Sequence, residues 1–413
     1  MNTDSMDHNL SKYAELAVRV GVNLQKGQTL VVNAPIQAVE LVRKIAKIAY
    51  EIGAKNVHVE WNDDDLTALK YKLAPDEAFT EYPMWRAQGM EQWSSTGEGA
   101  FLTILSPNPD LLKDIDPKRV ATATKTASTA LQKHRANSMS YRARWCLISV
   151  ANEAWAAKVF PSLPLEEAVE QLWAFVFKAT RVDLGDPIQA WNDHNDELHR
   201  KVNYLNAKQY RKLIYTAPGT NLTIGLPDKH VWLGGSKPAQ DEVPFNPNMP
   251  TEEVFTMPHK DEIDGVVRST KPLNYGGTVI DNFSLTFEKG RVTGMTAEQG
   301  EETLQHLLDT DEGARRLGEV ALVPFHSPIS DSNLIFFNTL FDENASNHLA
   351  LGQAYPTNIE GGTGMSKEEL AEHGVNTSLT HVDFMVGSAE MDIDGVTADG
   401  RNEPIFRNGN WAF

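Results

Sequence analysis

The feature that most constrains the fold of this chain is a strand, a helix and a second strand that follow one another near the N-terminus. Residues 29–33 form a short β-branched run that is typical of a buried strand. Apolar residues then recur on one face of a predicted helix over 36–52. Pro35 is favourable in the first turn of this helix, and Gly53 ends it. Residues 57–61 supply the second strand. This spacing predicts a βαβ unit with parallel strands.

Two further strands are predicted in the first half of the chain, over 100–105 and 145–150, with polar helical segments between them. The first half is therefore expected to be an α/β domain with a doubly wound, mostly parallel sheet. Helical patterns follow over 165–182 and 191–207, and they predict a connecting region.

After residue 210 the sequence changes to short alternating runs separated by turn residues, which indicate antiparallel strands. A predicted helix over 301–317 interrupts these runs. We therefore expect an N-terminal α/β domain over residues 1–205 and a C-terminal α+β domain with antiparallel strands over 206–413. The strands predicted in the second domain cover residues 212–215, 222–224, 231–233, 277–280, 283–287, 292–296, 379–387 and 390–396.

Charge and cysteine content narrow the range of partners. The chain has 38 Lys and Arg residues against 56 Asp and Glu, a net charge of −18 that repels nucleic-acid phosphates and anionic lipid surfaces. Its one cysteine, Cys146, can form neither an intrachain disulfide nor a multi-thiolate metal site. The sequence shows no signal-peptide pattern and no uncharged stretch as long as a membrane span. We expect a cytoplasmic protein that binds neither nucleic acid nor membrane.

Several common catalytic motifs are absent from the sequence. It contains no GxGxxG or GxxxxGK[ST] phosphate-binding loop, no GxSxG nucleophile turn and no HExxH zinc-binding helix. Cys146 lies within the apolar run 145–148 and is expected to be a small core residue. Nucleotide use, serine hydrolysis and helical zinc peptidase chemistry thereby lose their main support.

The clearest candidate site residues stand two apart in a predicted strand. His381 and Asp383 lie in the segment 379–386, and residues two apart on a strand project from the same face. An imidazole and a carboxylate side by side can bind one metal ion. The alternative is an alternating strand whose polar face is solvated.

A second cluster places acids, amides and an imidazole between apolar flanks. Glu343 and His348 are too far apart to be neighbours on a regular helix, yet a loop can turn both inward. The alternative is a helix N-terminus capped by Asp342 or Asn344.

Two more segments present carboxylates. The acid pair Glu252 and Glu253 follows a proline-rich stretch, and acid pairs are usually solvated. Glu319 leads into the apolar run 320–323 directly after a predicted helix. It is either an exposed helix-end residue or a buried carboxylate that needs a partner.

Together these segments have the composition of a metal site rich in oxygen and nitrogen ligands. Carboxylates and imidazoles without thiolate suit Zn²⁺, Mn²⁺ or Co²⁺. The combined charge of the carboxylates matches two divalent ions rather than one, and paired ions activate water and polarise carbonyls in aminopeptidases and phosphatases. The candidate ligands are Glu253, Glu319, Glu343, His348, His381 and Asp383.

Four ordered motifs, at residues 248–256, 317–323, 340–350 and 380–383, resemble the thermophilic metalloaminopeptidase family, the aminopeptidase T group. The resemblance extends over essentially the whole chain. It implies a metal-dependent aminopeptidase that hydrolyses the N-terminal residue from peptides with a water or hydroxide bridging two divalent metal ions. It also implies an intracellular homodimer with an interior cavity, acting on peptides that have a free N-terminus.

Carried over by position, the resemblance implies that all six candidate ligands bind metal and that Glu319 bridges the two ions. It further implies that Tyr355, in the segment 352–356, is a catalytic side chain close to them. The expected catalytic set is Tyr355, Glu319 and Glu253. Glu252 and Glu253 are both candidates for the carboxylate that accepts the proton.

Two other functions remain open. A binuclear hydrolase of another bond, such as a phosphoester, would need cationic clamps, and the motif segments contain only Arg315 and Arg316 as basic residues. A two-lobed protein that binds a small ligand would keep that ligand after treatment with a chelator, whereas an aminopeptidase would lose hydrolysis and regain it with a divalent ion.

Overall fold

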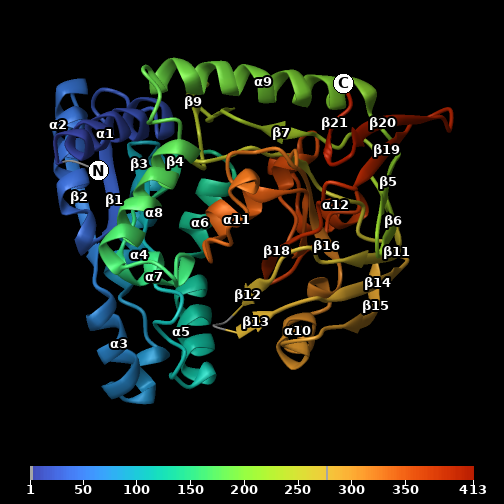
Figure 1. The fold of residues 1–413 in the computed structure, drawn as a ribbon, viewed down its shortest axis with the longest axis horizontal. Coiled ribbons are helices and arrows are strands. Elements are labelled where there is room, and N and C mark those ends of the chain that lie inside the picture. Colours follow the sequence, from blue (N-terminus) through green and yellow to red (C-terminus); the bar gives the residue numbers. More distant parts are fainter. Residues whose placement is uncertain (1–2, 276–277) are drawn as a thin grey trace. The chain divides into compact units, whose positions relative to one another are not determined.

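The computed structural model describes residues 3–275 and 278–413, and the chain forms two compact units, whose elements are labelled in Figure 1. The first unit comprises residues up to 194 together with 236–250, and the second comprises 195–235 together with 251–413. The predicted fold class is confirmed, because a parallel sheet precedes antiparallel sheets along the chain. The domain limits at 1–205 and 206–413 stay a prediction.

The first unit contains a four-stranded parallel sheet in the order β2-β1-β3-β4. Its central strand β1 is lined by Leu30 and Val32, which are fully buried. The helix α2 contacts both β1 and β2 and ends at Gly53, whose φ of 99° favours glycine. These elements are β1 (Thr29–Pro35), α2 (Val39–Ile52), β2 (Asn56–Asn62), β3 (Gly99–Leu105) and β4 (Trp145–Ser149).

The chain winds from β1 to β2 on one side and then to β3 and β4 on the other, which is the doubly wound arrangement predicted from the sequence. The further helices of this unit are α1 (Thr3–Leu16), α3 (Asp64–Leu73), α4 (Met84–Thr96), α5 (Pro117–Ala130), α6 (Gln132–Met139), α7 (Glu153–Val159) and α8 (Leu165–Ala179). The short strands β8 (Lys237–Pro238) and β9 (Pro244–Phe245) pair within the same unit. Helix α9 (Pro187–Lys208) comes directly before β5, the first strand of the second unit.

The second unit is built on an eight-stranded antiparallel sheet and a five-stranded antiparallel sheet. The first has the order β15 (Arg291–Thr296), β14 (Ser284–Glu288), β11 (Ile263–Arg268), β6 (Thr220–Gly225), β5 (Lys212–Ala217), β19 (Asp392–Val396), β20 (Asn402–Arg407) and β21 (Asn410–Trp411). The second has the order β18 (His381–Met385), β17 (His348–Gly352), β16 (Leu317–Leu322), β10 (Val254–Thr256) and β7 (Leu233–Gly234).

These two sheets share one hydrophobic core. The eight-stranded sheet contributes Leu213, Leu222 and Phe287 to it, and the five-stranded sheet contributes Val320 and Phe384. Side chains alternate between the faces of a strand, so the opposite face of the five-stranded sheet is available for other residues.

The helix predicted over 301–317 is too long. Helix α10 covers only Glu301–Leu308, and β16 already begins at Leu317. The Asp311 carboxylate accepts hydrogen bonds from the backbone N–H groups of Ala314 at 2.8 Å and Leu379 at 2.6 Å. Asp311 thereby stabilises a turn in place of a continuing helix.

Several predicted strands differ in extent from those observed, among them the runs 379–387 and 390–396, which are shorter as β18 and β19. The run 231–233 gives only β7, because the backbone N–H of Val231 bonds to the carbonyl of Asn358 at 2.8 Å. Of the run 277–280, Gly277 lies outside the described residues, and β13 (Thr278–Ile280) pairs with β12 (Leu273–Tyr275). Across the two described ranges, no helix has both the length and the apolar character needed to cross a membrane.

Candidate metal centre

The predicted ligands come from neighbouring strands of the five-stranded sheet and from one short helix. Glu253 directly precedes β10, and Glu319 lies within β16. His348 begins β17, while β18 carries the remaining imidazole and aspartate. Glu343 begins the 3₁₀ helix Glu343–Ala345, just before β17. Segments far apart in the sequence are therefore adjacent through strand pairing in the order β18-β17-β16-β10.

Strand register places the charged side chains on one face of this sheet. Ala350 of β17 lies opposite Glu319 on one side and opposite Asp383 on the other. Gly352, two residues further on, lies opposite His381. The first residue of β17 is two residues before Ala350 and so shares this face. The small residues at 350 and 352 leave room between the functional side chains.

The other face of the same strands explains why the site is held firmly. Val320, Leu349, Leu351 and Phe384 alternate with the charged residues and belong to the shared hydrophobic core. A slip of one residue in any of these strands would turn its charged side chains into the hydrophobic core and its apolar side chains toward the site. Core packing therefore fixes the register that brings the ligands together.

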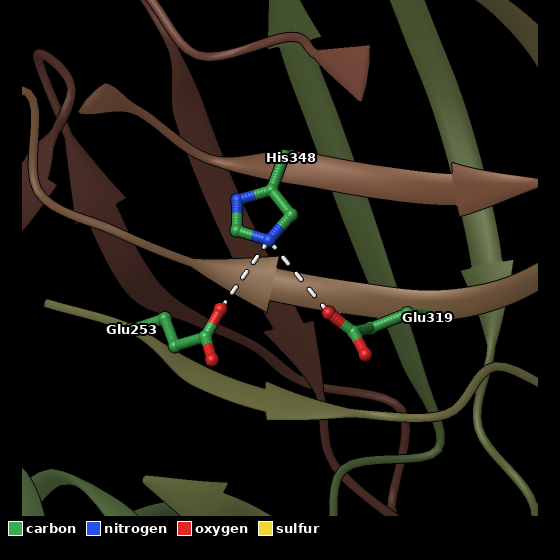
Figure 2. A group of neighbouring side chains, drawn as sticks. All are labelled: Glu253, Glu319 and His348. Atoms are coloured by element: carbon green, nitrogen blue, oxygen red, sulfur yellow. Dashed lines mark ion pairs between the residues drawn. The ribbon is translucent and has the colours of Figure 1, made fainter. Parts of the chain in front are cut away.

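Glu319 is common to two groups of side chains whose ligand atoms lie within 4.8 Å of one another. In the first, Nε2 of His348 is 3.4 Å from Oε2 of Glu253 and 3.6 Å from Oε1 of Glu319 (Figure 2). In the second, Nε2 of His381 is 3.9 Å from Oε2 of Glu319 and 3.4 Å from Oδ1 of Asp383. The two Glu319 oxygens thus face different histidines.

Backbone carbonyls orient both imidazoles. Nδ1 of His381 lies 2.7 Å from the carbonyl oxygen of Gln353, and Nδ1 of His348 lies 3.2 Å from that of Ser346. When Nδ1 donates its proton to these carbonyls, Nε2 is the ring nitrogen that faces the carboxylates and could bind a metal ion, as in metal-binding histidines. No sequence pattern marks these two carbonyls, because any residue type can supply one.

Burial perturbs the carboxylates of the cluster. Burial raises the pKa of Glu319, and the neighbouring histidines partly offset this increase. Burial, together with the charges of Glu253 and Asp383, raises the pKa of Glu343 well above its ordinary value. Glu343 is therefore close enough to the cluster to sense its charge, although it belongs to neither three-residue group. Several negative charges in a buried place favour a bound cation.

The carboxylates also raise the pKa values of the two histidines, against the effect of burial. Burial alone lowers the pKa of His348, but hydrogen bonding to Glu253 and Glu319 raises it well above its ordinary value. Burial likewise opposes charging of His381, yet Asp383 and Glu319 raise its pKa to about 10. The raised histidine pKa values therefore reflect the negative charge of the surrounding carboxylates.

Asp383 offers a direct test of whether a metal ion fits. Its Oδ1 is buried without a hydrogen-bond partner among the described residues. Burial opposes ionisation, but the charge of His381 lowers the pKa of Asp383, so the carboxylate is anionic. A buried anionic oxygen that makes no hydrogen bond and faces ligand atoms of Glu319 and His381 is an arrangement that a divalent cation satisfies.

Tyr355 lies beside the second group. Its ring packs edge-on against His381, with 5.1 Å between centroids, and also against Phe255, at 6.2 Å. Burial and the surrounding carboxylates raise the pKa of the Tyr355 phenol well above its ordinary value, so the hydroxyl keeps its proton.

The structure contradicts the solvent-exposed alternatives for these segments. Glu252, Glu253 and Glu319 are buried, and the His381 and Asp383 side chains are only 22% and 12% exposed. They are therefore neither a solvated acid pair, an exposed helix end nor a solvated strand face.

The alternative helix-capping role is also wrong. Asn338 caps α11 (Thr339–Asp342) by accepting from the backbone N–H of Leu340. Asn344 instead accepts from the backbone N–H of Glu252 at 2.7 Å and donates to the carbonyl of Leu340 at 2.9 Å. This amide joins the acid pair to the segment that carries Glu343.

Gly318 also contributes to the site and was not predicted from the sequence. The pairing of β16 with β17 shifts register between Leu317 and Glu319. A Cβ atom at position 318 would lie 2.4 Å from the carbonyl oxygens of Gly352 and Gln353. Only glycine allows this approach. The sequence indicates this role only through the position of Gly318 directly before Glu319.

Buried carboxylates and imidazoles that converge on one sheet face define a donor set of the kind found in metal-dependent hydrolases. Residues 6–411 match the model of the thermophilic metalloprotease family (M29), and the chain belongs to this family. The family expected from the sequence is confirmed.

Named relatives cover the chain almost completely. Aminopeptidase 2 of Geobacillus stearothermophilus is 65% identical over 404 residues, 98% of each chain. Aminopeptidase AmpS of Bacillus subtilis is 57% identical over 410 residues, 99% of this chain and 100% of the relative. The solved structure of wild-type AmpT from Thermus thermophilus superposes with a TM-score of 0.93 at 45% identity, covering 99% of this chain and 100% of the other.

Proposed function

We propose that this protein is an aminopeptidase that removes the N-terminal residue from peptides and uses two divalent metal ions, Zn²⁺, Co²⁺ or Mn²⁺. The observation that carries the proposal is the position of Glu319, whose carboxylate belongs to both ligand groups. Relatives named aminopeptidases, at up to 65% identity over nearly the whole chain, support peptides as the substrate class. They favour this function over hydrolysis of another bond and over binding of a small ligand.

Five of the six predicted ligands form two groups, one for each proposed ion, with Glu319 shared between them. Glu253, Glu319 and His348 would hold one, and Glu319, His381 and Asp383 the other. We propose Glu343 as an additional ligand, since its carboxylate interacts with those of Glu253 and Asp383. When bound, such a pair of ions lowers the pKa of a water between them and polarises a carbonyl.

The remaining residues of the site act on protons and charge. We propose that the Tyr355 phenol, which stays protonated, donates a hydrogen bond to the oxygen of the substrate carbonyl as negative charge develops there. The proton acceptor is one of the adjacent acids Glu252 and Glu253. The acidic surroundings would also attract the α-ammonium of the substrate, which is a physical reason for acting at a free N-terminus.

We also retain a cytoplasmic homodimer as part of the proposal. It rests on the family resemblance, and for the compartment on the presence of a single, buried cysteine, Cys146.

Comparison of free and blocked substrates tests the proposed function. We expect the metal-loaded protein to hydrolyse leucine p-nitroanilide but not its N-acetyl analogue, because the acidic site recognises the ammonium group. Dialysis against a chelator should abolish the activity, and Co²⁺, Mn²⁺ or Zn²⁺ should restore it. Equal cleavage of the blocked compound, or full activity after chelation confirmed by metal analysis, would overturn the proposal.

Replacement of Tyr355 by phenylalanine tests its role. We expect kcat to fall by roughly 10²-fold, the scale of losing one oxyanion donor, with metal content unchanged. Tyr215→Phe is the matched control, because the Tyr215 hydroxyl is also buried but has no hydrogen-bond partner within the described ranges. If both variants keep wild-type kcat, Tyr355 has only a structural role.

A further inference from the structure

A pocket of about 100 Å³ adjoins the candidate metal centre along the edge strand β18. Asp383 itself lines the pocket, together with Met385 from the same strand. Leu273 and Val279 of the β12–β13 hairpin line it as well, and so does Ile335. Of the six candidate ligands only Asp383 lines the pocket, so metal binding alone does not explain it.

Strand geometry places this pocket on the metal-centre face of the sheet. Met385 is two residues beyond Asp383 and therefore projects from the same face. It also lies opposite His348 in the register of β17 and β18. Another wall comes from residues 335–342, which directly precede Glu343 in the chain. The pocket is thus bounded by the segments that carry the proposed ligands.

Hydrogen bonds tie the pocket walls to fixed parts of the unit. The backbone N–H of Thr270 donates to the carbonyl of Met385 at 2.9 Å, and its hydroxyl donates to the carbonyl of Gly387 at 2.8 Å. On the other side, the Asp342 carboxylate accepts from the backbone N–H groups of Phe336 at 2.7 Å and Asn338 at 3.1 Å. The pocket is therefore a built feature whose walls keep a defined distance from Asp383.

The lining chemistry selects among side chains. Leu273, Val279, Ile335 and Met385 present hydrocarbon beside the polar side chains of Asn274 and Thr339. Among the residues that the structure describes, no lysine, arginine or histidine lines the pocket. Both oxygens of Asp342 are engaged by backbone donors. An acidic side chain would find no cation there, and a basic one would find no free carboxylate other than the proposed ligand Asp383.

The size of the pocket limits the occupant further. An apolar cavity of about 150 Å³ accommodates benzene, so about 100 Å³ corresponds to a smaller aliphatic group. Leucine, valine and methionine side chains are of this class, whereas the indole of tryptophan exceeds it.

We infer that this pocket receives the side chain of the residue to be removed and selects medium-sized aliphatic residues at the substrate N-terminus. The inference rests on the proposed aminopeptidase function. A substrate whose scissile carbonyl lies between the metal ligands and Tyr355 carries its first side chain one bond away from that carbonyl, within reach of the lining beside Asp383. Ile335, Leu273 and Val279 are then specificity residues that do not take part in the chemistry.

A series of aminoacyl p-nitroanilides with the wild-type, metal-loaded protein tests the inference. We expect kcat/KM for leucine to exceed that for alanine by about tenfold or more, as buried methylene groups provide, and also to exceed those for tryptophan, glutamate and lysine. A preference for a charged or a tryptophan residue would overturn the assignment.

Two variants at Ile335 make the test independent of absolute activity. Ile335→Trp fills the pocket and should reduce the leucine-to-alanine ratio of kcat/KM about tenfold, whatever the absolute rate of the variant. Ile335→Ala enlarges the pocket and should raise phenylalanine relative to leucine. Val266→Trp, at a position 38% exposed on β11, is the matched control and should leave both ratios unchanged.

The outcomes separate the pocket from the function. If alanine p-nitroanilide is cleaved by every variant but both ratios stay within twofold of wild type, the pocket assignment is wrong and the aminopeptidase proposal stands. If the metal-loaded wild type cleaves none of the free-amine substrates, the proposed function is wrong and the pocket assignment falls with it.

Discussion

The Glu319→Gln variant is expected to retain its fold, to bind less than one metal ion per chain and to lose hydrolysis almost completely. Glu319 faces His348 with one oxygen and His381 with the other, at 3.6 and 3.9 Å. Glutamine keeps the shape but removes the negative charge from both ligand groups at once. The loss should exceed the 10- to 100-fold effects typical of residues that only support a ligand.

Metal analysis after dialysis, melting temperature and kcat for leucine p-nitroanilide together check this prediction. Glu302→Gln is the matched control, since its side chain is 92% exposed on α10 and it should behave as wild type. Two tightly bound ions and normal turnover in Glu319→Gln would show that this carboxylate is not shared between metals.

Removal of either β18 ligand should abolish turnover but spare the other half of the site. In His381→Ala or Asp383→Ala the second group is broken, whereas Glu253, Glu319 and His348 keep their mutual distances. We therefore expect about one ion per chain and loss of activity on the same scale as for Glu319→Gln. The difference in stoichiometry between these variants and Glu319→Gln is the distinctive result.

Metal content and single-turnover hydrolysis measured on the same samples check this difference. His306→Ala provides the comparison, because this histidine is 74% exposed on α10. Wild-type activity in His381→Ala would exclude that residue from the centre, and complete loss of metal would mean that the two groups do not bind independently.

Regular elements with strong local patterns were the predictable part of the fold. The strand over 29–33, the helix over 36–52 and its end at Gly53 follow from apolar periodicity and glycine geometry, and the structure has each of them. The helix over 301–317 was wrong because the local pattern continues past the point where Asp311 bonds to Leu379. A contact across 68 positions in the sequence leaves no periodic trace.

The candidate ligands could also be predicted from local sequence patterns. His381 and Asp383 stand two apart within an apolar run, so one face of that strand had to be polar. Which strands pair could not be predicted, because the pairing of β17 with β16 and with β18 depends on the register imposed by the shared core. Nor could the carbonyls of Gln353 and Ser346 be identified, because they belong to the backbone.

The arrangement of the site on a sheet has a mechanical consequence. The strands that carry the ligands pack against the core through residues such as Val320 and Phe384, and the register of β16 and β17 shifts at Gly318, next to Glu319. Side chains on such a frame lose little further freedom when a cation binds. Preorganised ligands of this kind increase affinity and hold substrate groups in a defined geometry.

Anomalous diffraction from crystals of the cobalt-loaded protein, recorded on both sides of the cobalt absorption edge, tests the central claim most directly. We expect two anomalous peaks per chain on the same face of the five-stranded sheet, one among Glu253, Glu319 and His348 and one among Glu319, His381 and Asp383. A single peak, or peaks that do not share Glu319, would contradict a paired-metal centre in this protein.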